Sequence, residues 1–161
     1  MLEGGSRFGF NTMRAVVQRV ARATVYISET KKSAIEKGLL IFLGVEKGDS
    51  ETDADYLLGK VLNLRVFEDP EGKMNLSLVD QGGGLMVISQ FTLLGDCRKG
   101  RRPSFFQAEE PKAAKRLYEH VIRQAEAAGV PVASGKFQAM MTIEAVNDGP
   151  VTILLDSRRV F

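Results

Sequence analysis

The sequence holds very few of the side chains that bind metals or form disulfides. Its 161 residues include one cysteine, Cys97, one histidine, His120, and no tryptophan. A single cysteine cannot form an internal disulfide, and one cysteine with one histidine cannot supply the ligands of a structural zinc site. We therefore predict a protein without a disulfide framework, a bound metal or a cofactor.

Long hydrophobic runs and a strong excess of charge are also missing. The longest apolar run, residues 38–45, is far shorter than the roughly 20 residues that a membrane helix needs. No charged start followed by an apolar stretch and a cleavage site marks a signal peptide. The net charge of +2 permits a nucleic-acid partner without requiring one. These absences predict a cytoplasmic protein that does not enter a membrane.

The chain length predicts one domain, preceded by a short leader. Residues 1–12 are rich in glycine and small polar residues and show no period, whereas a strongly patterned segment starts at Met13. We interpret residues 1–12 as a vector-derived or disordered leader and residues 13–161 as the domain.

Segments with strand character outnumber those with helical character. Apolar side chains recur at helical spacing after Ser50, which forms a capping box with Asp53, and over residues 111–128, which begin with Pro111. Strands are predicted at 13–27, 39–43, 84–94, 137–146 and 151–156. This pattern predicts an α+β fold in which two main helices pack on a curved, barrel-like sheet.

Polar side chains interrupt the predicted buried strand at Ser89, Gln90 and Thr92. Burying a hydroxyl or an amide costs a few kcal/mol unless it finds a partner. The strand is therefore either half-exposed, with these side chains in solvent, or part of a site. In a site, the two hydroxyls and neighbouring backbone N–H groups would surround a reacting carbonyl.

Residues 147–152, with the sequence NDGPVT, join the last two predicted strands. Asn, Asp and Gly favour a hairpin turn, but Pro150 is unusual there because a second strand normally uses its first N–H. A cis peptide bond before Pro150 would instead direct two backbone carbonyls toward a positively charged group.

Basic residues gather in a loop flanked by glycine and proline: Arg98, Lys99, Arg101 and Arg102. This loop is either a solvated surface or a phosphate-binding segment, because arginine forks match phosphate oxygens. Cys97 adjoins the loop, but no histidine lies near it in the sequence to activate it as a nucleophile. His120 has polar helical neighbours, so we expect it to face solvent rather than to act as a base.

Taken in order, five segments resemble the D-aminoacyl-tRNA deacylase family. They are residues 13–20 (MRAVVQRV), 72–75 (GKMN), 89–93 (SQFTL), 102–105 (RPSF) and 147–152 (NDGPVT). The resemblance implies hydrolysis of the ester between a D-amino acid and the terminal adenosine of tRNA, and also of glycine mischarged on alanine tRNA. It implies a homodimer with an active site at each subunit interface.

The resemblance also assigns roles to individual residues. Ser89, Gln90, Phe91 and Thr92 match the catalytic wall of the pocket. Gly149 and Pro150 match a cis dipeptide that one subunit inserts into the other's pocket, where its carbonyls hold the α-amino group and exclude L side chains. Arg19 is implied to brace this dipeptide, and Phe137 and Met141 to line the pocket.

An aminoacyl ester is already activated, so positioning and oxyanion stabilisation can supply much of the rate. We expect backbone N–H groups near Phe91 and Thr92 to bind the oxyanion, while a water assisted by the ribose 2′-hydroxyl attacks. A rival hypothesis makes the Thr92 hydroxyl the nucleophile. Two other functions remain open: a general small-ester hydrolase that uses Thr92 or Ser89, and a non-catalytic nucleic-acid-binding dimer.

Overall fold

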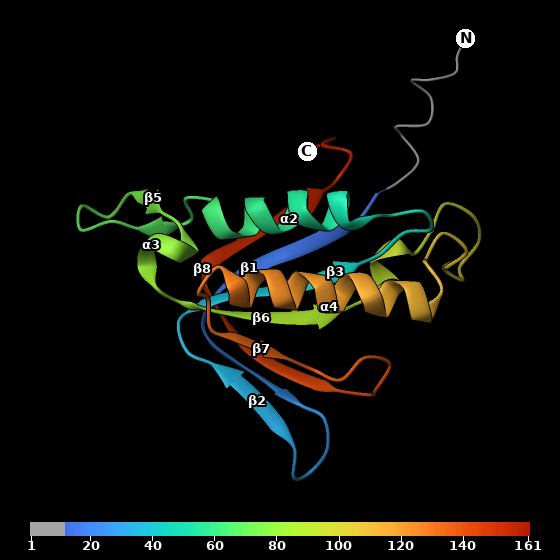
Figure 1. The fold of residues 1–161 in the computed structure, drawn as a ribbon, viewed down its shortest axis with the longest axis horizontal. Coiled ribbons are helices and arrows are strands. Elements are labelled where there is room, and N and C mark those ends of the chain that lie inside the picture. The colour runs from blue at the N-terminus through green and yellow to red at the C-terminus, as the bar shows by residue number, and fades with distance from the viewer. Residues whose placement is uncertain (1–11) are drawn as a thin grey trace.

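The computed structural model describes residues 12–161, and the elements of this part of the chain form one layered unit (Figure 1). Its strands are β1 (Arg14–Tyr26), β2 (Lys32–Ile35), β3 (Gly38–Gly44), β4 (Phe67–Glu68), β5 (Met74–Leu76), β6 (Gly84–Ser89), β7 (Val132–Ser134) and β8 (Thr142–Asp156). Its helices are α2 (Glu51–Asn63), α3 (Leu78–Gln81), α4 (Pro111–Ala127) and the 3-10 helix η1 (Phe91–Leu94). The predicted leader lies outside the described residues except for Thr12. That residue is buried, and its hydroxyl accepts a hydrogen bond from the Arg158 guanidinium.

The long strand β1 organises the sheet. One of its edges pairs along its whole length with β8, from Tyr26 opposite Thr142 to Arg14 opposite Asp156. Its other edge pairs first with β3 and then with β2, both antiparallel. Alternate side chains, among them Ala15 and Val17, point into the core, which confirms the strand predicted from the apolar alternation.

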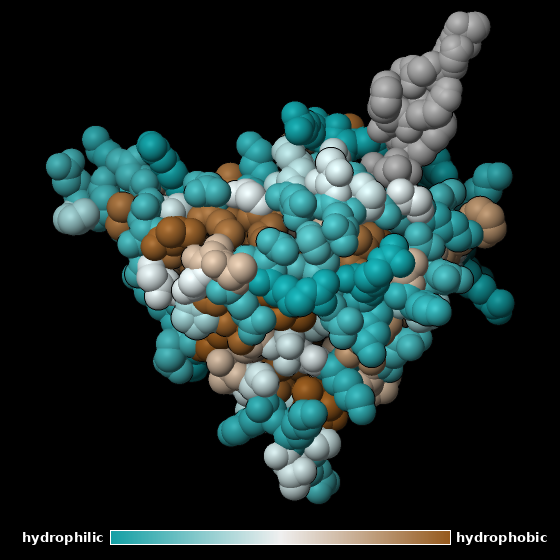
Figure 2. Space-filling model, in the orientation of Figure 1, coloured by the Kyte–Doolittle hydropathy of each residue, from teal (hydrophilic) through white to brown (hydrophobic). Residues whose placement is uncertain are grey.

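Strands β3, β6 and β7 run parallel, and the two main helices cover one face of the sheet. The chain passes from β3 to β6 through α2 and from β6 to β7 through α4. Parallel neighbours need such crossovers. In Figure 1 both helices lie across the same side of the strands. Figure 2 shows hydrophilic residues over the outer surfaces of the helices and hydrophobic residues in the gaps between elements.

Two hydrophobic cores occupy the two faces of the curved sheet. The larger core joins the sheet to the helices through fully buried residues such as Leu57, Leu85 and Leu117. The smaller core lies on the opposite face and includes Val25, Leu40 and Met86. Strands β2 and β7, from the two ends of the sheet, come within 8 Å of each other. The predicted α+β fold with a curved, barrel-like sheet and two main helices is confirmed.

The strand predicted at 84–94 is too long. Strand β6 ends at Ser89, and Gln90 turns the chain while its N–H donates to the Leu43 carbonyl (2.8 Å). The next residues form η1, whose end is fixed by the Gly95 N–H donating to the Thr92 carbonyl (3.0 Å). The polar residues thus lie where the buried strand stops.

The two strands predicted at 137–146 and 151–156 are one strand, β8, and residues 137–141 form a loop. No hairpin reverses the chain at residues 147–150, because β1 is long enough to pair with both halves. Between paired positions, β1 advances two residues, from Val20 to Gln18, while β8 advances five, from Asn147 to Thr152. The three additional residues form a bulge that projects from the strand.

Candidate active site

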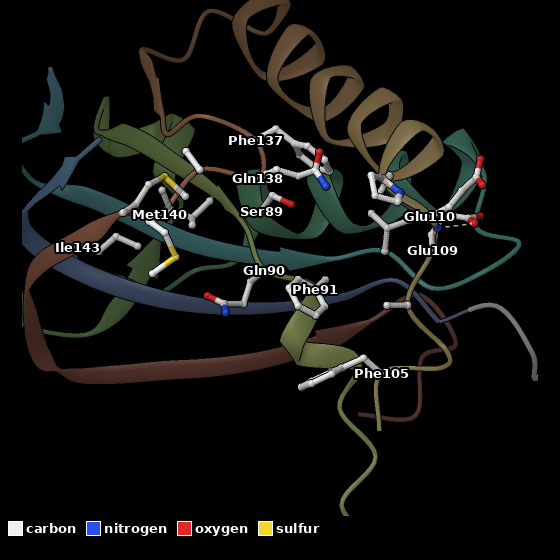
Figure 3. Close-up of a pocket in the computed structure, with 17 residues that line it drawn as sticks. Ser89, Gln90, Phe91, Phe105, Glu109, Glu110, Phe137, Gln138, Met140 and Ile143 are labelled. Atoms are coloured by element: carbon white, nitrogen blue, oxygen red, sulfur yellow. Dashed lines mark hydrogen bonds between the residues drawn. The ribbon is translucent and has the colours of Figure 1, made fainter. Parts of the chain in front are cut away.

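A cleft of about 700 Å³ opens where β6 ends, between η1, the start of α4 and the loop that precedes β8 (Figure 3). It is lined by Val45, Ile88, Ser89, Gln90, Phe91, Phe105, Ala108, Glu109, Glu110, Pro111, Ala114, Phe137, Gln138, Ala139, Met140, Met141 and Ile143. Five of the predicted site residues therefore meet here: Ser89, Gln90, Phe91, Phe137 and Met141.

Thr92 lies beside the cleft but does not line it. Its side chain is exposed, and its hydroxyl accepts a hydrogen bond from the Gln90 side-chain amide. Phe91 is 57% exposed as a residue, and its ring meets the Phe105 ring edge-to-face, with 5.1 Å between the ring centres. The near wall of the cleft is therefore a short turn with one aromatic pair.

The start of η1 presents backbone donors at this wall. The Leu93 N–H donates to the Gln90 carbonyl (3.2 Å), but within the described residues neither the Phe91 N–H nor the Thr92 N–H has an acceptor. Leading N–H groups of a helical turn have no partner within the turn. The geometry can therefore offer two adjacent donors to a carbonyl oxygen.

The far wall is the loop of residues 135–141, which sequence reasoning assigned in part to a strand. Phe137 packs against Tyr118, with ring centres 5.9 Å apart. Gln138 has a φ of 64°, which is uncommon for a residue other than glycine. Any Cβ at position 135 would lie 2.3 Å from the Met141 sulfur, so Gly135 allows that side chain to approach. The sequence of this loop has no periodic pattern. The sequence therefore did not predict that Gln138, Ala139 and Met140 line the cleft.

Acidic groups lie at the α4 end of the cleft and behind it. Glu109 accepts a hydrogen bond from the Gly48 N–H (3.1 Å), and Glu110 precedes the first turn of α4. Behind them Asp49 is buried, and burial raises the pKa of its carboxyl to about 8. Burial also raises the pKa of Glu46. Glu46 and Asp49 both belong to the segment that joins β3 to α2.

Arg19, Gly149 and Pro150 do not line this cleft. The buried Arg19 side chain reaches the β8 bulge, where its Nε donates to the Asp148 carbonyl (3.1 Å), and its Nη1 donates to the Val66 carbonyl (2.8 Å). Asn147 Oδ1 accepts from the Val151 N–H (3.1 Å), which closes the bulge. The Gly149–Pro150 peptide bond is cis, and both residues are exposed.

The basic loop forms a second hollow of about 550 Å³, lined by Asp96, Arg98, Lys99, Arg102 and Ser104. Arg98 donates from Nε (2.9 Å) and Nη2 (2.7 Å) to the two carboxylate oxygens of Asp96. This pairing lowers the pKa of Asp96 and raises that of Arg98. Arg101 is exposed in the same loop.

The prediction that His120 faces solvent is wrong. Only 8% of the residue is exposed, because α2 packs over it and brings Asp55 to 2.8 Å from Nε2 and Glu51 to 3.7 Å from Nδ1. His120 thus links the two helices and does not line the cleft. Cys97 is exposed. Within residues 12–161 no three His, Cys, Asp or Glu side chains gather as metal ligands, and no helix is long and apolar enough to cross a membrane.

The chain is similar to curated proteins over nearly its whole length. It is 62% identical to a D-aminoacyl-tRNA deacylase from Syntrophus aciditrophicus and 56% identical to one from Clostridioides difficile. Each alignment covers 149 residues, which are 92% of this chain and 100% of the relative.

Two solved structures have the same fold. A c-Myc DNA unwinding element binding protein superposes with a TM-score of 0.81 at 37% identity, covering 88% of this chain and 97% of that one. A probable eukaryotic D-amino acid tRNA deacylase superposes with a TM-score of 0.73 at 19% identity, over 90% of this chain and 99% of that one. A family model for D-Tyr-tRNA(Tyr) deacylase matches residues 16–156. The family inferred from the five sequence segments is therefore confirmed: this chain belongs to the D-Tyr-tRNA(Tyr) deacylases.

Proposed function

We propose that this chain hydrolyses the ester bond between a D-amino acid and the terminal adenosine of tRNA, and so removes D-amino acids before they enter translation. The observation that carries the proposal is the family membership together with the cleft, which is built from the matched residues Ser89, Gln90 and Phe91. Because aminoacyl-tRNA is a substrate of translation, we place the reaction in the cytoplasm.

The chemistry that fits this cleft needs no nucleophile from the protein. As water attacks the ester carbonyl, negative charge develops on its oxygen, and the unpaired N–H groups of Phe91 and Thr92 would stabilise that charge. The ribose 2′-hydroxyl of the substrate would assist the water. The Thr92 hydroxyl accepts a hydrogen bond from the Gln90 side-chain amide, and Thr92 does not line the cleft. Both observations argue against this hydroxyl as the nucleophile.

Selection against L-amino acids would come from a second copy of the chain. The exposed Gly149–Pro150 dipeptide does not line the cleft of its own subunit. In the proposed homodimer it enters the partner's cleft, where its carbonyls accept hydrogen bonds from the α-amino group. An L side chain would then collide with the backbone, whereas glycine has no side chain to exclude, so glycine mischarged on alanine tRNA is also a substrate.

The basic loop would bind the tRNA backbone. Lys99, Arg101 and Arg102 are exposed near the cleft, and Arg98 is held in place by Asp96. Lysine and arginine contacts to phosphates supply affinity that weakens as salt rises.

The test follows release of amino acid from D-Tyr-tRNA and from L-Tyr-tRNA, each with and without a chelator. Rapid hydrolysis of the D form alone, unaffected by the chelator, supports the proposal. Hydrolysis of neither form overturns it. Equal hydrolysis of both forms overturns the proposed chiral exclusion. Turnover of simple esters as fast as of D-Tyr-tRNA would indicate the general ester hydrolase instead.

A second candidate is a dimer that binds nucleic acid without hydrolysing it. The similarity to the c-Myc DNA unwinding element binding protein favours this candidate. The double variant Arg101→Glu, Arg102→Glu separates the two. A deacylase should lose tRNA affinity but still cleave a minimal D-aminoacyl-adenosine, whereas a binding protein should cleave neither substrate before or after the change.

A further inference from the structure

We infer that Phe105 and Phe106, next to the basic loop, stack the unpaired nucleotides that precede the terminal adenosine of the substrate. The inference rests on the proposed function, and it adds a binding track for the single-stranded 3′ end outside the cleft. It follows from three exposed aromatic residues, two of which line the cleft while the third, Phe106, directly follows Phe105 in the chain. Phe91 is 57% exposed, Phe105 38% and Phe106 72%.

Phe105 lies at the border between the cleft and the basic hollow. Phe105 lines the cleft, and its neighbour Ser104 lines the hollow. Two backbone hydrogen bonds fix this border: the Asp96 N–H donates to the Ser104 carbonyl (2.7 Å), and the Ser104 N–H donates to the Asp96 carbonyl (2.9 Å). A strand that places its last nucleotide in the cleft and its phosphates in the hollow must therefore pass Phe105.

Gly95 makes room for this ring at the end of η1. A Cβ at Gly95 would lie 3.1 Å from Phe105 Cε1, and on its other side Phe105 meets Phe91 edge-to-face. Figure 3 shows Phe91 and Phe105 flanking η1 at the rim of the cleft. The ring is held by its neighbours while 38% of the residue stays open to solvent, so a base can stack without the chain rearranging.

Phe106 combines an aromatic ring with a positive charge. The Lys47 ammonium lies 3.6 Å from the centre of the ring, and the Lys47 N–H donates to the Gln107 carbonyl (2.9 Å). Phe106 is nonetheless 72% exposed as a residue. An aromatic face beside an ammonium matches a nucleotide, which offers a base for stacking and a phosphate for the charge.

The charges around these rings favour a polyanion over a protein partner. Lys47, Lys99, Arg101 and Arg102 are all exposed in these segments. Asp96, the acid among them, is paired with Arg98. Glu109 and Glu110 line the cleft and not the basic hollow, and Glu109 accepts a hydrogen bond from the Gly48 N–H, next to Lys47 (3.1 Å). Stacking tolerates any base, so the track would accept every tRNA that shares the same 3′ end.

The experiment compares three substrates that carry the same D-amino acid: D-aminoacyl-adenosine, a D-aminoacyl trinucleotide ending in that adenosine, and full D-aminoacyl-tRNA. We expect Phe106→Ala to raise KM about tenfold for the trinucleotide and the tRNA, with kcat unchanged. Hydrolysis of D-aminoacyl-adenosine should stay at the wild-type rate. Phe106→Tyr should restore KM because it keeps the ring. Val79→Ala, an exposed apolar residue on α3, is the matched control.

An unchanged KM for both longer substrates overturns the inference and leaves the aromatic rings as a surface for another protein. An equal loss on all three substrates also overturns it, because the defect would then lie in the cleft. Failure of the wild-type protein to hydrolyse any of the three substrates would instead reject the proposed function itself. Because Phe106 is largely exposed, the alanine variant should fold, which circular dichroism would verify.

Discussion

Gly149 holds a backbone conformation with a φ of 126°, which other residues rarely adopt, directly against a buried guanidinium. A Cβ at this position would lie 2.8 Å from Arg19 Nη2 and 2.9 Å from Val151 Cγ2. Arg19 also forms an ion pair with Asp148, with 3.6 Å between Nε and Oδ2. The conformation of the β8 bulge thus depends on the absence of one methyl group.

We expect Gly149→Ala to abolish discrimination between D-Tyr-tRNA and L-Tyr-tRNA and to lower the free energy of unfolding by about 1–3 kcal/mol. The matched control is Gly129→Ala, which also has a positive φ (86°) but has no atom within 4 Å of the added Cβ. The control has the backbone strain without the steric contact, so it should lose less stability and keep its selectivity. Urea denaturation and paired hydrolysis assays measure both effects, and unaltered selectivity in Gly149→Ala would contradict the proposed role of the bulge.

Replacement of Thr92 distinguishes the two hydrolytic mechanisms. We expect Thr92→Ala to keep hydrolysis of D-Tyr-tRNA within about tenfold of wild type, since the proposed oxyanion donors are backbone groups that the change leaves in place. Rapid-quench kinetics should trap no acyl-enzyme. Thr52→Ala, at an exposed position on α2, is the control. Near-total loss of activity in Thr92→Ala alone would instead establish the hydroxyl as the nucleophile.

At the scale of elements, the junction of β3 and α2 contains a carboxyl with an unusual ionisation. The Asp49 carboxylate accepts a hydrogen bond from the Glu46 N–H (2.6 Å), but its other oxygen, Oδ1, has no partner among the described residues. Burial raises the pKa of Asp49 to about 8. The folded protein therefore keeps a proton that the unfolded chain loses near its ordinary pKa of about 4.

The free energy of unfolding should therefore fall as pH rises from about 4 to about 8, because the folded state binds more protons across this window. We expect Asp49→Asn to flatten this slope and to stabilise the protein at pH 8 by on the order of 1–3 kcal/mol. Glu46, with its pKa also raised, leaves a residual slope of the same sign. The lowered pKa values of Asp69 and Asp80 act below pH 4.

Urea denaturation at pH 5 and pH 8 measures this slope. Glu126→Gln, an exposed carboxyl on α4, should leave it unchanged. A slope that persists in full in Asp49→Asn would show that other groups carry the linkage.

The elements that the sequence predicts well are those whose burial is local. Strand β3 and helices α2 and α4 bury one continuous run or one face, and the Ser50 capping box with Asp53 is present. The continuity of β8 depends on its pairing with β1, more than 110 residues away in the chain, so the NDG signal indicates a turn that the sheet converts into a bulge. Likewise, His120 is buried by another helix, which its own helical neighbours cannot reveal.

The same distinction applies to the candidate site. The polar interruption at Ser89 and Gln90 is visible in the sequence because it breaks an apolar run. The contact of Arg19 with Asp148 joins residues 129 positions apart, and only the family resemblance indicated that Arg19 braces the adjoining Gly149–Pro150 dipeptide. The Gln138 side of the cleft lies in a loop without a pattern, so neither periodicity nor motif could assign it.

For the molecule as a whole, the described surface includes an apolar strip next to β8. A groove of about 480 Å³ is lined by apolar residues, among them Val16, Leu93, Leu154, Val160 and Phe161, and also by three charged residues, Arg14, Asp156 and Arg158. Leu154 is 55% exposed and Phe161 61%. Apolar patches of this kind commonly mark protein interfaces, and this one adjoins the strand that carries the proposed specificity dipeptide.

We expect Leu154→Lys to weaken the proposed homodimer at least tenfold, since it would replace an exposed apolar side chain by an ammonium next to Arg14 and Arg158, which line the same groove. Sedimentation equilibrium measures the dissociation constant, and Val79→Lys on α3 is the control. Chiral selectivity should fall with the dimer, because each cleft would lose the partner's dipeptide. A monomeric variant that still rejects L-Tyr-tRNA would place the specificity element within one chain.

The bulge in β8 has three more residues than the stretch of β1 opposite it. Pairing resumes on both sides of the bulge, at Asn147 opposite Val20 and at Thr152 opposite Gln18. The faces that Leu154 and Leu155 occupy are therefore set by their partners on β1, Val16 and Ala15, and not by the number of residues in the bulge. The bulge can gain or lose a residue without shifting the register of the end of β8, because the change falls in an unpaired segment.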